Sequence, residues 1–285
     1  MAKDKTPLLL KIVRWAYPKV EKIWPAVAYR YFVSLFFTPL NYPVPTEEKE
    51  AALRAEKFFI EVDNKKVQGY SWGSGIKIVM VVHGWAGRAT QFRNFILPFL
   101  NAGYRVVGFD APAHGNSQGK TTNIFEFEVV LRKIYERVGE PDAIIAHSFG
   151  GGAVLFSAMH GLPVRKLINI ASPTIGDEII KTYLTAIHGS PETGKFFKDY
   201  ILKEHGKPFD NFTASYFVQN LPNPIALLLV HDEDDHEVSI QQAIMLQKIY
   251  PRAKLYKTKG LGHTRILRDS TVIQMCLTFI QQGDL

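Results

Sequence analysis

The 285-residue sequence contains a single cysteine, Cys276, so no disulfide framework can form within the chain. Nothing in this cysteine usage points to an oxidising compartment, and we therefore expect a reducing, cytoplasmic setting. Uninterrupted apolar runs are also short, because none reaches the roughly eighteen residues that a membrane-spanning helix needs. The first apolar stretches contain charges and lack a small-residue cleavage site, so we expect no cleavable signal peptide.

Long clusters of lysine and arginine are absent as well, although the formal net charge is +7. Since there is no recognisable reader motif either, we expect no nucleic-acid partner. The lone Gly73-Ser-Gly75 precedes a predicted strand and not a helix, so it is not a nucleotide-binding fingerprint. What the chain does contain is 46% apolar residues, which is enough to bury the core of one large domain with an insertion.

The positive charge is concentrated in residues 1–30, which carry seven Lys or Arg against two acidic residues. Apolar and aromatic stretches lie between these charges, interrupted by Pro18, Pro25 and Pro39. The pattern predicts an N-terminal helical segment over residues 1–57. Two interpretations of its apolar faces stay open: the helices pack on the protein's own core, as one-sided apolar helices usually do, or residues 1–40 make a peripheral contact with an anionic membrane surface.

Further along the chain, strand and helix patterns alternate. Two short runs, 58–62 and 66–72, predict a hairpin. The elements predicted after Ile78 are a strand over 104–109, a helix near 122–138, a strand over 142–147, a helix over 150–160 and a strand over 165–171. This alternation is typical of an α/β protein with a parallel sheet. It fails between 173 and 222, a stretch rich in helix formers and aromatic residues.

A short apolar strand runs into His147 and Ser148 and is followed by three consecutive glycines. This order predicts a strand, a sharp turn that carries Ser148, and a helix. A serine at such a corner has a strained backbone that exposes its hydroxyl, so its neighbours two residues away, here Ala146 and Gly150, must be small. The pattern favours a catalytic nucleophile, and a phosphate-binding turn at the start of the helix is the alternative.

An activated serine needs a base, an acid that orients the base, and donors for an oxyanion. Two later segments offer the first two: an apolar strand that ends in the acidic turn 231–237, and a glycine-flanked His263. Ser148, an aspartate within that turn, and His263 follow the chain order of one hydrolase architecture. The acidic turn also suggests a metal site, but consecutive side chains point apart and no second ligand cluster is obvious, so we expect no metal.

With these motifs the chain resembles the α/β-hydrolase superfamily over roughly residues 66–282. Val79 to Gly87 is similar to the family's third strand and its His-Gly turn, and Phe109 to Ser117 is similar to the turn after the fourth strand. The resemblance implies an α/β-hydrolase fold, with a mostly parallel central sheet flanked by helices. The implied parts are a core formed by residues 58–172 and 223–285 and a helical cap inserted over residues 173–222.

The same resemblance implies the roles of four residues. Ser148 is the nucleophile, His263 is the base, and the backbone amides of Trp85 and Phe149 form the oxyanion hole. No cofactor is implied for this chemistry. The aromatic residues of the cap would give an apolar pocket wall, unless they hold the cap together.

The acidic turn aligns with the family pattern His-Gly-x-x-Asp-x-x-Val, which makes Asp235 the implied orienting acid and Asp234 the second candidate. Asp232 stands where the family often has glycine. Arg88 follows the His-Gly turn, and we expect it to face solvent. The residues expected to shape the site without reacting are His83, Gly84, Asp110, His114, His147, Gly150, His231 and Asp232.

The function implied by the resemblance is that of a serine hydrolase which cleaves a carboxylic ester-type bond of a small, partly apolar substrate through an acyl-enzyme. An acyltransferase or thioesterase with the same residues is one alternative. A non-catalytic ligand-binding member of the fold is another. The sequence indicates neither the substrate nor the oligomeric state.

Overall fold

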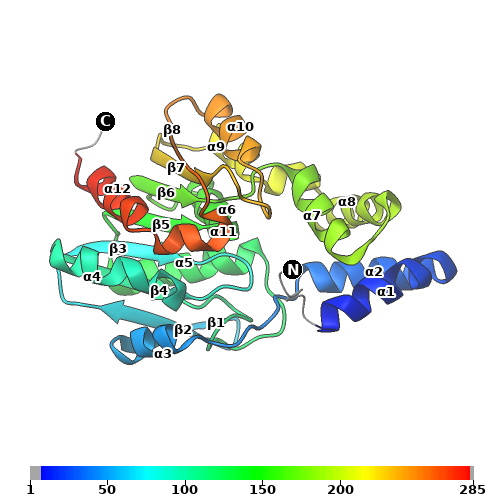
Figure 1. Cartoon of the computed structure of the whole chain (residues 1–285), viewed down its shortest axis with the longest axis horizontal. Helices are drawn as coiled ribbons and strands as arrows, with labels where there is room; N and C mark the ends of the chain where they lie inside the picture. Colours follow the sequence, from blue (N-terminus) through cyan, green and yellow to red (C-terminus); the bar gives the residue numbers. More distant parts are fainter. Residues whose placement is uncertain (1–7, 283–285) are drawn as a thin grey trace. The chain divides into compact units, whose positions relative to one another are not determined.

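The computed structural model of the chain describes residues 8–282 and divides into two compact units (Figure 1). The core unit comprises Pro39–Thr174 and the chain from Ala214 onward. The helical unit comprises the chain up to Thr38 together with Ile175–Thr213. Each unit is described by itself below.

An eight-stranded sheet forms the centre of the core unit, with the strand order β1-β2-β4-β3-β5-β6-β7-β8. The strands β1 and β2 pair antiparallel, β2 also pairs antiparallel with β4, and every other pair is parallel. The mostly parallel sheet of the predicted fold class is therefore present. The strands are β1 (Glu56–Val62), β2 (Lys65–Trp72), β3 (Lys77–Val82), β4 (Tyr104–Phe109), β5 (Ala143–His147), β6 (Lys166–Ile170), β7 (Ala226–Asp232) and β8 (Lys254–Thr258).

The first two strands form the predicted hairpin. Val62 pairs with Lys65, so only Asp63 and Asn64 make the turn, and both have positive φ angles of 47° and 62°. A two-residue turn with positive φ at both positions matches the right-handed twist of the strands, and Asp and Asn tolerate that conformation.

Helices cover both faces of the sheet (Figure 1). Contacts of α4 with α12 place these two helices together, and α5, α6 and α9 form a second group. The central strands β3 and β5 are buried along nearly their whole length, which explains their continuous apolar sequence. The helices of this unit are α3 (Thr46–Leu53), η1 (Ala89–Phe92), α4 (Arg93–Asn101), α5 (Ile124–Val138), α6 (Phe149–Met159), α9 (Ala214–Gln219), α10 (Gln241–Ile249), α11 (Gly262–Arg265), η3 (Ile266–Arg268) and α12 (Ser270–Gln281).

The helical unit pairs two N-terminal helices with the insertion between β6 and β7. Its elements are α1 (Leu8–Ile23), α2 (Pro25–Phe36), α7 (Gly176–Ile187), α8 (Pro191–His205) and η2 (Phe209–Phe212). Phe36 of α2 packs on Phe197 of α8 and on Tyr183 of α7, with ring centroids 4.3 Å and 4.5 Å apart. Arg14 Nε donates to Ala186 O at 2.8 Å.

These contacts identify what the N-terminal helices pack against. The sequence left two partners open for the apolar faces of α1 and α2, the protein's own core and a membrane surface. Within the helical unit, apolar faces of these helices pack on α7 and α8. Several aromatic residues of the insertion, among them Phe197 and Phe209, are buried in this shared core. These aromatic residues hold the helical unit together, which is the second of the two roles that the sequence left open for them.

The boundaries of the units differ from the predicted ones at two helices. The predicted insertion extends to residue 222, but α9 lies in the core unit because Phe217 packs on Phe156 of α6 at 5.2 Å. The predicted N-terminal segment extends to residue 57, but α3 also lies in the core unit, where Ala51 O accepts a hydrogen bond from Trp72 Nε1.

Candidate active site

Ser148 lies between β5 and α6, at the carboxyl end of a central strand. Its φ of 51° and ψ of −125° fall in a region that residues other than glycine rarely adopt. The corner is held from both sides, since Ser148 N donates to Ile170 O at 2.8 Å and Ser172 Oγ donates to Ser148 O at 2.6 Å. The backbone strain expected at this serine is therefore present.

Two glycines allow other backbone segments to approach this corner. A Cβ atom on Gly150 would lie 2.6 Å from Val82 O and 2.5 Å from His83 O, so only glycine fits against the end of β3. A Cβ atom on Gly84 would lie 2.7 Å from Ser148 Cβ. The His-Gly turn and the serine corner are thus in direct contact.

The side chains of Asp235 and His263 form a pair at the ends of β7 and β8. His263 Nδ1 lies 2.8 Å from Asp235 Oδ2. Because a carboxylate can only accept, Nδ1 carries the proton, and Nε2 is left as the basic nitrogen of the ring. The side chain of Asp235 is fully buried and that of His263 is 9% exposed, so little water competes for this bond.

Asp235 is ionised in this setting. Burial by itself raises the pKa of the Asp235 carboxyl, but hydrogen bonds from His231, His263 and Val238 N outweigh burial and bring the pKa below its usual value. Asp235 Oδ1 accepts from Glu237 N at 2.8 Å and from Val238 N at 2.9 Å. The carboxylate is therefore fixed in position as well as charged.

Two neighbouring aspartates hold the loop that leads to His263. Asp232 Oδ2 accepts from Thr258 Oγ1 at 2.7 Å and from Leu261 N at 3.0 Å. Asp234 Oδ2 accepts from Gly260 N at 3.1 Å. Asp234, the second candidate for the orienting acid, therefore bonds to the loop backbone, and it is Asp235 that contacts the imidazole.

His147 connects His263 to the serine corner. His147 Nε2 donates to His263 O at 2.9 Å, and the two imidazole rings lie 4.8 Å apart between centroids. Burial, together with the nearby His263, lowers the pKa of His147 to about 3, so His147 is neutral at neutral pH. Because His147 directly precedes Ser148, these contacts bring the segments of the nucleophile and base candidates side by side.

The turn after β3 contains Trp85, whose amide is predicted to help form an oxyanion hole. The rings of Trp85 and Phe149 pack edge to face with centroids 5.3 Å apart, so the two residues lie next to each other. Ala86 has a φ of 56°, and its N–H donates to His114 Nε2 at 3.0 Å. Burial lowers the pKa of His114 to about 4, which keeps this ring nitrogen free to accept.

His83 and Asp110 hydrogen-bond to the backbone of the surrounding turns. His83 Nδ1 donates to Gly84 O at 2.7 Å, and Nε2 accepts from Ala111 N at 2.9 Å. Complete burial holds the pKa of His83 well below its ordinary value. Asp110 Oδ1 accepts from Ala89 N at 2.9 Å, which ties the two turns together.

The expectation that Arg88 faces solvent is wrong. Arg88 is only 8% exposed, and its Nε donates to Glu48 Oε2 at 2.7 Å. Its Nη1 also donates to Tyr42 O at 3.1 Å. Glu48 is 3% exposed, and a buried carboxylate requires a charged partner, so Arg88 is held within the core unit.

The sequence did not single out Ser172 and Thr258, which both contact site segments. Ser172 follows β6 and Thr258 ends β8. Polar residues at the carboxyl ends of parallel strands meet at one edge of the sheet, and that position was the available signal. Without a motif around them, neither residue stood out.

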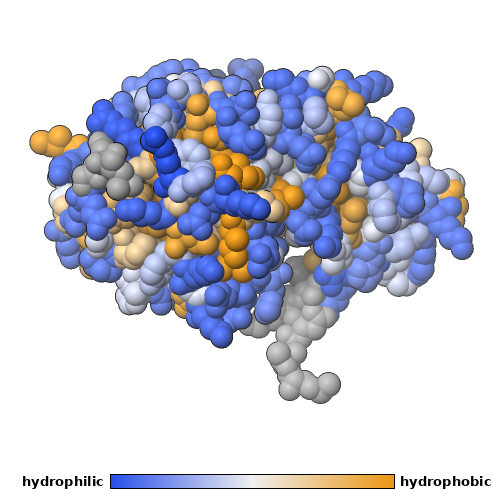
Figure 2. Space-filling model, turned by 90° about the horizontal axis from the view of Figure 1, so that it is seen from above, coloured by the Kyte–Doolittle hydropathy of each residue, from blue (hydrophilic) through white to orange (hydrophobic). Residues whose placement is uncertain are grey.

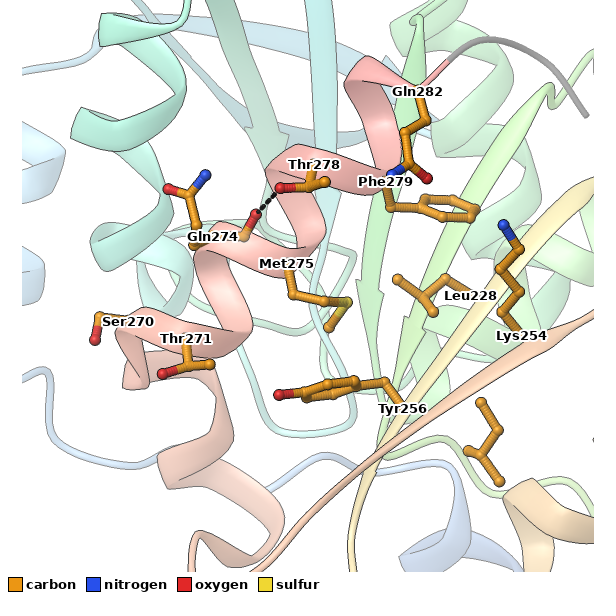
Figure 3. Close-up of a pocket in the computed structure, with 11 residues that line it drawn as sticks. Leu228, Lys254, Tyr256, Ser270, Thr271, Gln274, Met275, Thr278, Phe279 and Gln282 are labelled. Carbon is orange, nitrogen blue, oxygen red and sulfur yellow. Dashed lines mark hydrogen bonds between the residues drawn. The ribbon is translucent and has the colours of Figure 1, made fainter.

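A separate groove lies between β8 and α12 (Figure 3). It has a volume of about 830 Å³, and its apolar lining includes Leu228, Tyr256 and Met275. Ser148, Asp235 and His263 are not among its lining residues, so this groove is distinct from the candidate site. Within residues 8–282, no group of three or more His, Cys, Asp or Glu side chains is arranged to hold a metal ion.

Comparison with known proteins identifies a family for this chain. A family model described as alpha/beta hydrolase fold matches residues 77–221, about half of the chain. A serine hydrolase-like protein of Danio rerio is 32% identical over 139 residues, which is 46% of this chain and 41% of that protein. The chain thus spans about two fifths of the length of the curated relatives it matches first.

Solved structures agree with this comparison at the level of the fold. An esterase of Pyrococcus furiosus superposes with a TM-score of 0.66 at 18% identity, covering 87% of this chain and 100% of that one. A thioesterase domain from the curacin biosynthetic pathway superposes with a TM-score of 0.59 at 16% identity, covering 80% and 99%.

Proposed function

This chain belongs to the α/β-hydrolase fold family, and we propose that it is a serine hydrolase that cleaves a carboxylic ester-type bond of a small, partly apolar substrate. The observation that carries the proposal is the 2.8 Å contact between His263 Nδ1 and Asp235 Oδ2, made beside the strained corner that holds Ser148. Nucleophilic acyl transfer requires a base that is oriented by a buried carboxylate and placed next to a serine.

In the proposed reaction, Ser148 Oγ attacks the carbonyl carbon of the ester while His263 Nε2 takes the hydroxyl proton. The carbonyl oxygen becomes an oxyanion that accepts hydrogen bonds from the amides of Trp85 and Phe149. The carbon–oxygen bond to the alcohol then breaks, and His263 returns its proton to the leaving alcohol. Water repeats these steps on the acyl-enzyme and releases the acid, so the cycle needs no cofactor.

The proposed role of Asp235 is to orient the imidazole and to stabilise the imidazolium that forms in each step. Its lowered pKa supports this role, because an ionised carboxylate stabilises a neighbouring positive charge. The paired aromatic rings of Trp85 and Phe149 support an apolar group on the substrate, since both rings are only half-buried beside Ser148.

An acyltransferase or thioesterase is the second candidate, supported by the fold shared with a thioesterase domain. The same acyl-enzyme would form in each case, and only the leaving group or the acceptor would differ. Paired substrates that carry one acyl chain as an oxygen ester and as a thioester would separate these functions by their kcat/KM values.

The direct test of the proposed function is labelling by a fluorophosphonate probe, which reacts with an activated serine. We expect labelling of the wild-type protein, loss of labelling in Ser148→Ala, and full labelling in the control Ser239→Ala, whose side chain is exposed. Turnover of short p-nitrophenyl esters should fall by about 10⁴-fold in His263→Ala. Equal labelling of wild type and Ser148→Ala would overturn the proposal, and a wild-type protein that is folded but never labelled would favour the non-catalytic alternative.

A further inference from the structure

The hairpin formed by α1 and α2 has a second apolar face that does not belong to the core of the helical unit. Six large apolar side chains are exposed on it, and we call them the hairpin patch. They are Ile12, Trp15, Ile23, Trp24, Val27 and Tyr31. Both tryptophans are more than half exposed, at 69% for Trp15 and 63% for Trp24, although tryptophan side chains are on average highly buried.

The patch follows one side of α1 and continues over the turn into α2. Ile12, Trp15 and Ile23 recur at helical spacing on the side of α1 opposite Tyr17, which is buried in the core of the unit. The five consecutive residues 23–27, Ile-Trp-Pro-Ala-Val, are all exposed at the turn. They form an apolar tip at the end of the hairpin.

This tip is rigid. Trp24 N donates to Val20 O at 2.7 Å, and Trp24 O accepts from Val27 N and Ala28 N at 3.0 Å and 3.2 Å. Pro25 opens α2, where its fixed φ favours the helix. An apolar tip held in this way loses little conformational freedom when a partner covers it.

The charges around the patch are positive. Lys19, Lys22 and Arg30 are exposed, and Lys19 Nζ lies 3.2 Å from the centre of the Trp15 ring. The sequence of α1 and α2 contains one acidic residue, Glu21. The carboxylate of Glu21 is turned to the insertion, where it accepts from Ser190 N at 3.1 Å. The outer face of the hairpin therefore combines apolar side chains with basic ones that lie among and beside them.

We propose that the hairpin patch docks on the surface of a membrane that contains anionic phospholipid. Tryptophan and aliphatic side chains bury themselves at the boundary between headgroups and acyl chains, and surrounding Lys and Arg side chains attract anionic headgroups. No helix within the described part of the chain is long and apolar enough to cross a bilayer, so the contact is peripheral.

The structure accommodates both interpretations of this segment that the sequence left open. One side of the hairpin packs on α7 and α8 through residues such as Phe32 and Phe36, while the other side carries the hairpin patch. On the face of the molecule shown in Figure 2, hydrophilic residues predominate and apolar residues form separate patches. A patch that combines two exposed tryptophans with basic side chains matches the chemistry of an anionic lipid surface.

The proposal goes beyond the hydrolase activity and is tested without it, by flotation of the full chain with liposomes. We expect the wild-type protein to float with vesicles of phosphatidylcholine and phosphatidylserine and to stay behind with pure phosphatidylcholine. The double variant Ile23→Ser, Trp24→Ser should lower the bound fraction by about tenfold or more, because binding scales with the apolar area buried. The variant Lys22→Gln, Arg30→Gln should weaken binding by roughly fivefold for each charge removed.

Matched controls separate the patch from exposed apolar and basic residues in general. Ile76→Ser, Leu97→Ser removes two exposed apolar side chains of the core unit, and Lys133→Gln, Lys248→Gln removes two exposed charges there. Both controls should float like wild type. Circular dichroism and fluorophosphonate labelling, measured without vesicles, should be unchanged in all four variants, since every substituted side chain is exposed.

Three results would overturn the proposal. They are a wild-type protein that does not float with anionic vesicles at low salt, patch variants that float as well as wild type, and controls that lose flotation with the patch variants. A dimer that the patch variants convert to a monomer, together with no flotation, would assign the patch to self-association instead. Failure of labelling with intact flotation would count against the hydrolase function and leave the membrane contact in place.

Discussion

The two units of this protein hold their residues in place by different means. In the core unit, backbone pairing along eight strands fixes where each strand ends, and the candidate site is assembled from residues just beyond those ends. The helical unit has no sheet among residues 8–38 and 175–213, and its four long helices there are held by a shared aromatic core that includes Phe32, Phe36, Phe197 and Phe209.

This difference determines where reactive groups can be placed. The loops after β7 and β8 are tied to each other by backbone pairing and by the side chains of Asp232 and Asp234, so the 2.8 Å contact between Asp235 and His263 can be maintained against thermal motion. A helix packed through aromatic rings can shift by fractions of an ångström without losing its contacts. We therefore expect polar substitutions in the core unit to change activity and aromatic substitutions in the helical unit to change stability.

The largest effect is expected for Asp235→Asn. An amide at this position can present its NH₂ group to His263 Nδ1, which favours the tautomer that cannot take the serine proton through Nε2. We expect kcat for ester hydrolysis to fall by about 10⁴-fold with little change in stability. Asp234→Asn is the matched control in the same loop, and it should lose less than about tenfold because the Asp234 side chain bonds to Gly260 N and not to the imidazole. Equal losses in the two variants would contradict the assignment of Asp235.

The next effect should be confined to the helical unit. Phe197 is fully buried and its ring contacts Phe32, Phe36 and Phe209, so Phe197→Ala should destabilise this unit by about 3–5 kcal/mol. Thermal unfolding followed by limited proteolysis should then show cleavage within the helical unit first. The matched variant Phe99→Ala in the core unit should expose sheet segments instead, and cleavage at the same sites in both variants would show that the units unfold together.

Much of the core unit could be predicted from the sequence because its signals are local. The corner at Ser148 follows from small residues around one serine, and the hairpin turn follows from Asp63-Asn64. The family resemblance, confirmed by the match over residues 77–221, supplied the chain order of Ser148, Asp235 and His263. The roles of these residues stay predictions until the labelling and turnover tests are made.

The rest could not be predicted because it depends on contacts between distant parts of the chain. Arg14 and Ala186 are bonded across 172 positions, and no local pattern indicates which apolar face α1 will meet. The burial of Arg88 depends on Glu48, forty positions earlier. The edge strand β8 is short and half polar, so its sequence does not resemble the buried strands beside it.

A moderate effect is expected at Asp232, which stands where the family often has glycine. Asp232→Ala removes the acceptor for Thr258 Oγ1 and Leu261 N, so the loop that carries His263 should loosen. We expect a loss of about 1–3 kcal/mol in stability from the unpaired groups. Loss of alignment at His263 should lower kcat by about tenfold with little change in KM. Thr258→Val removes one of the same contacts and should show a smaller loss, and a wild-type kcat in Asp232→Ala would rule out this positioning role.

The smallest expected effect is a dependence of stability on pH, which should be larger in the core unit than in the helical unit. Buried histidines lie in the core unit, among them His114 and His147, whereas His188 and His205 of the helical unit are exposed. Burial lowers the pKa of His114 to about 4 and contributes to a pKa of about 3 for His147, so the unfolded chain binds protons that the folded core does not. Stability of the core unit should therefore fall as the pH drops below the ordinary histidine pKa of about 6.5. The lowered pKa of Asp235 adds a loss only below about pH 4, where an unfolded aspartate begins to protonate.

His114→Gln tests this assignment by its pH dependence and not by its stability at one pH. Gln can offer an acceptor to Ala86 N but takes up no proton, so the variant should lose less stability than wild type between pH 7.5 and 5.5. Between these pH values, wild type should lose about 1 kcal/mol more of its free energy of unfolding than the variant. The reason is that an unfolded histidine with an ordinary pKa of about 6.5 titrates over roughly one pH unit of this range. Urea unfolding at the two pH values, followed by tryptophan fluorescence, measures this difference. The control His236→Gln replaces an exposed histidine of the same unit and should leave the pH dependence of wild type unchanged. If His114→Gln loses as much stability as wild type on acidification, another group is responsible for the acid sensitivity of the core unit.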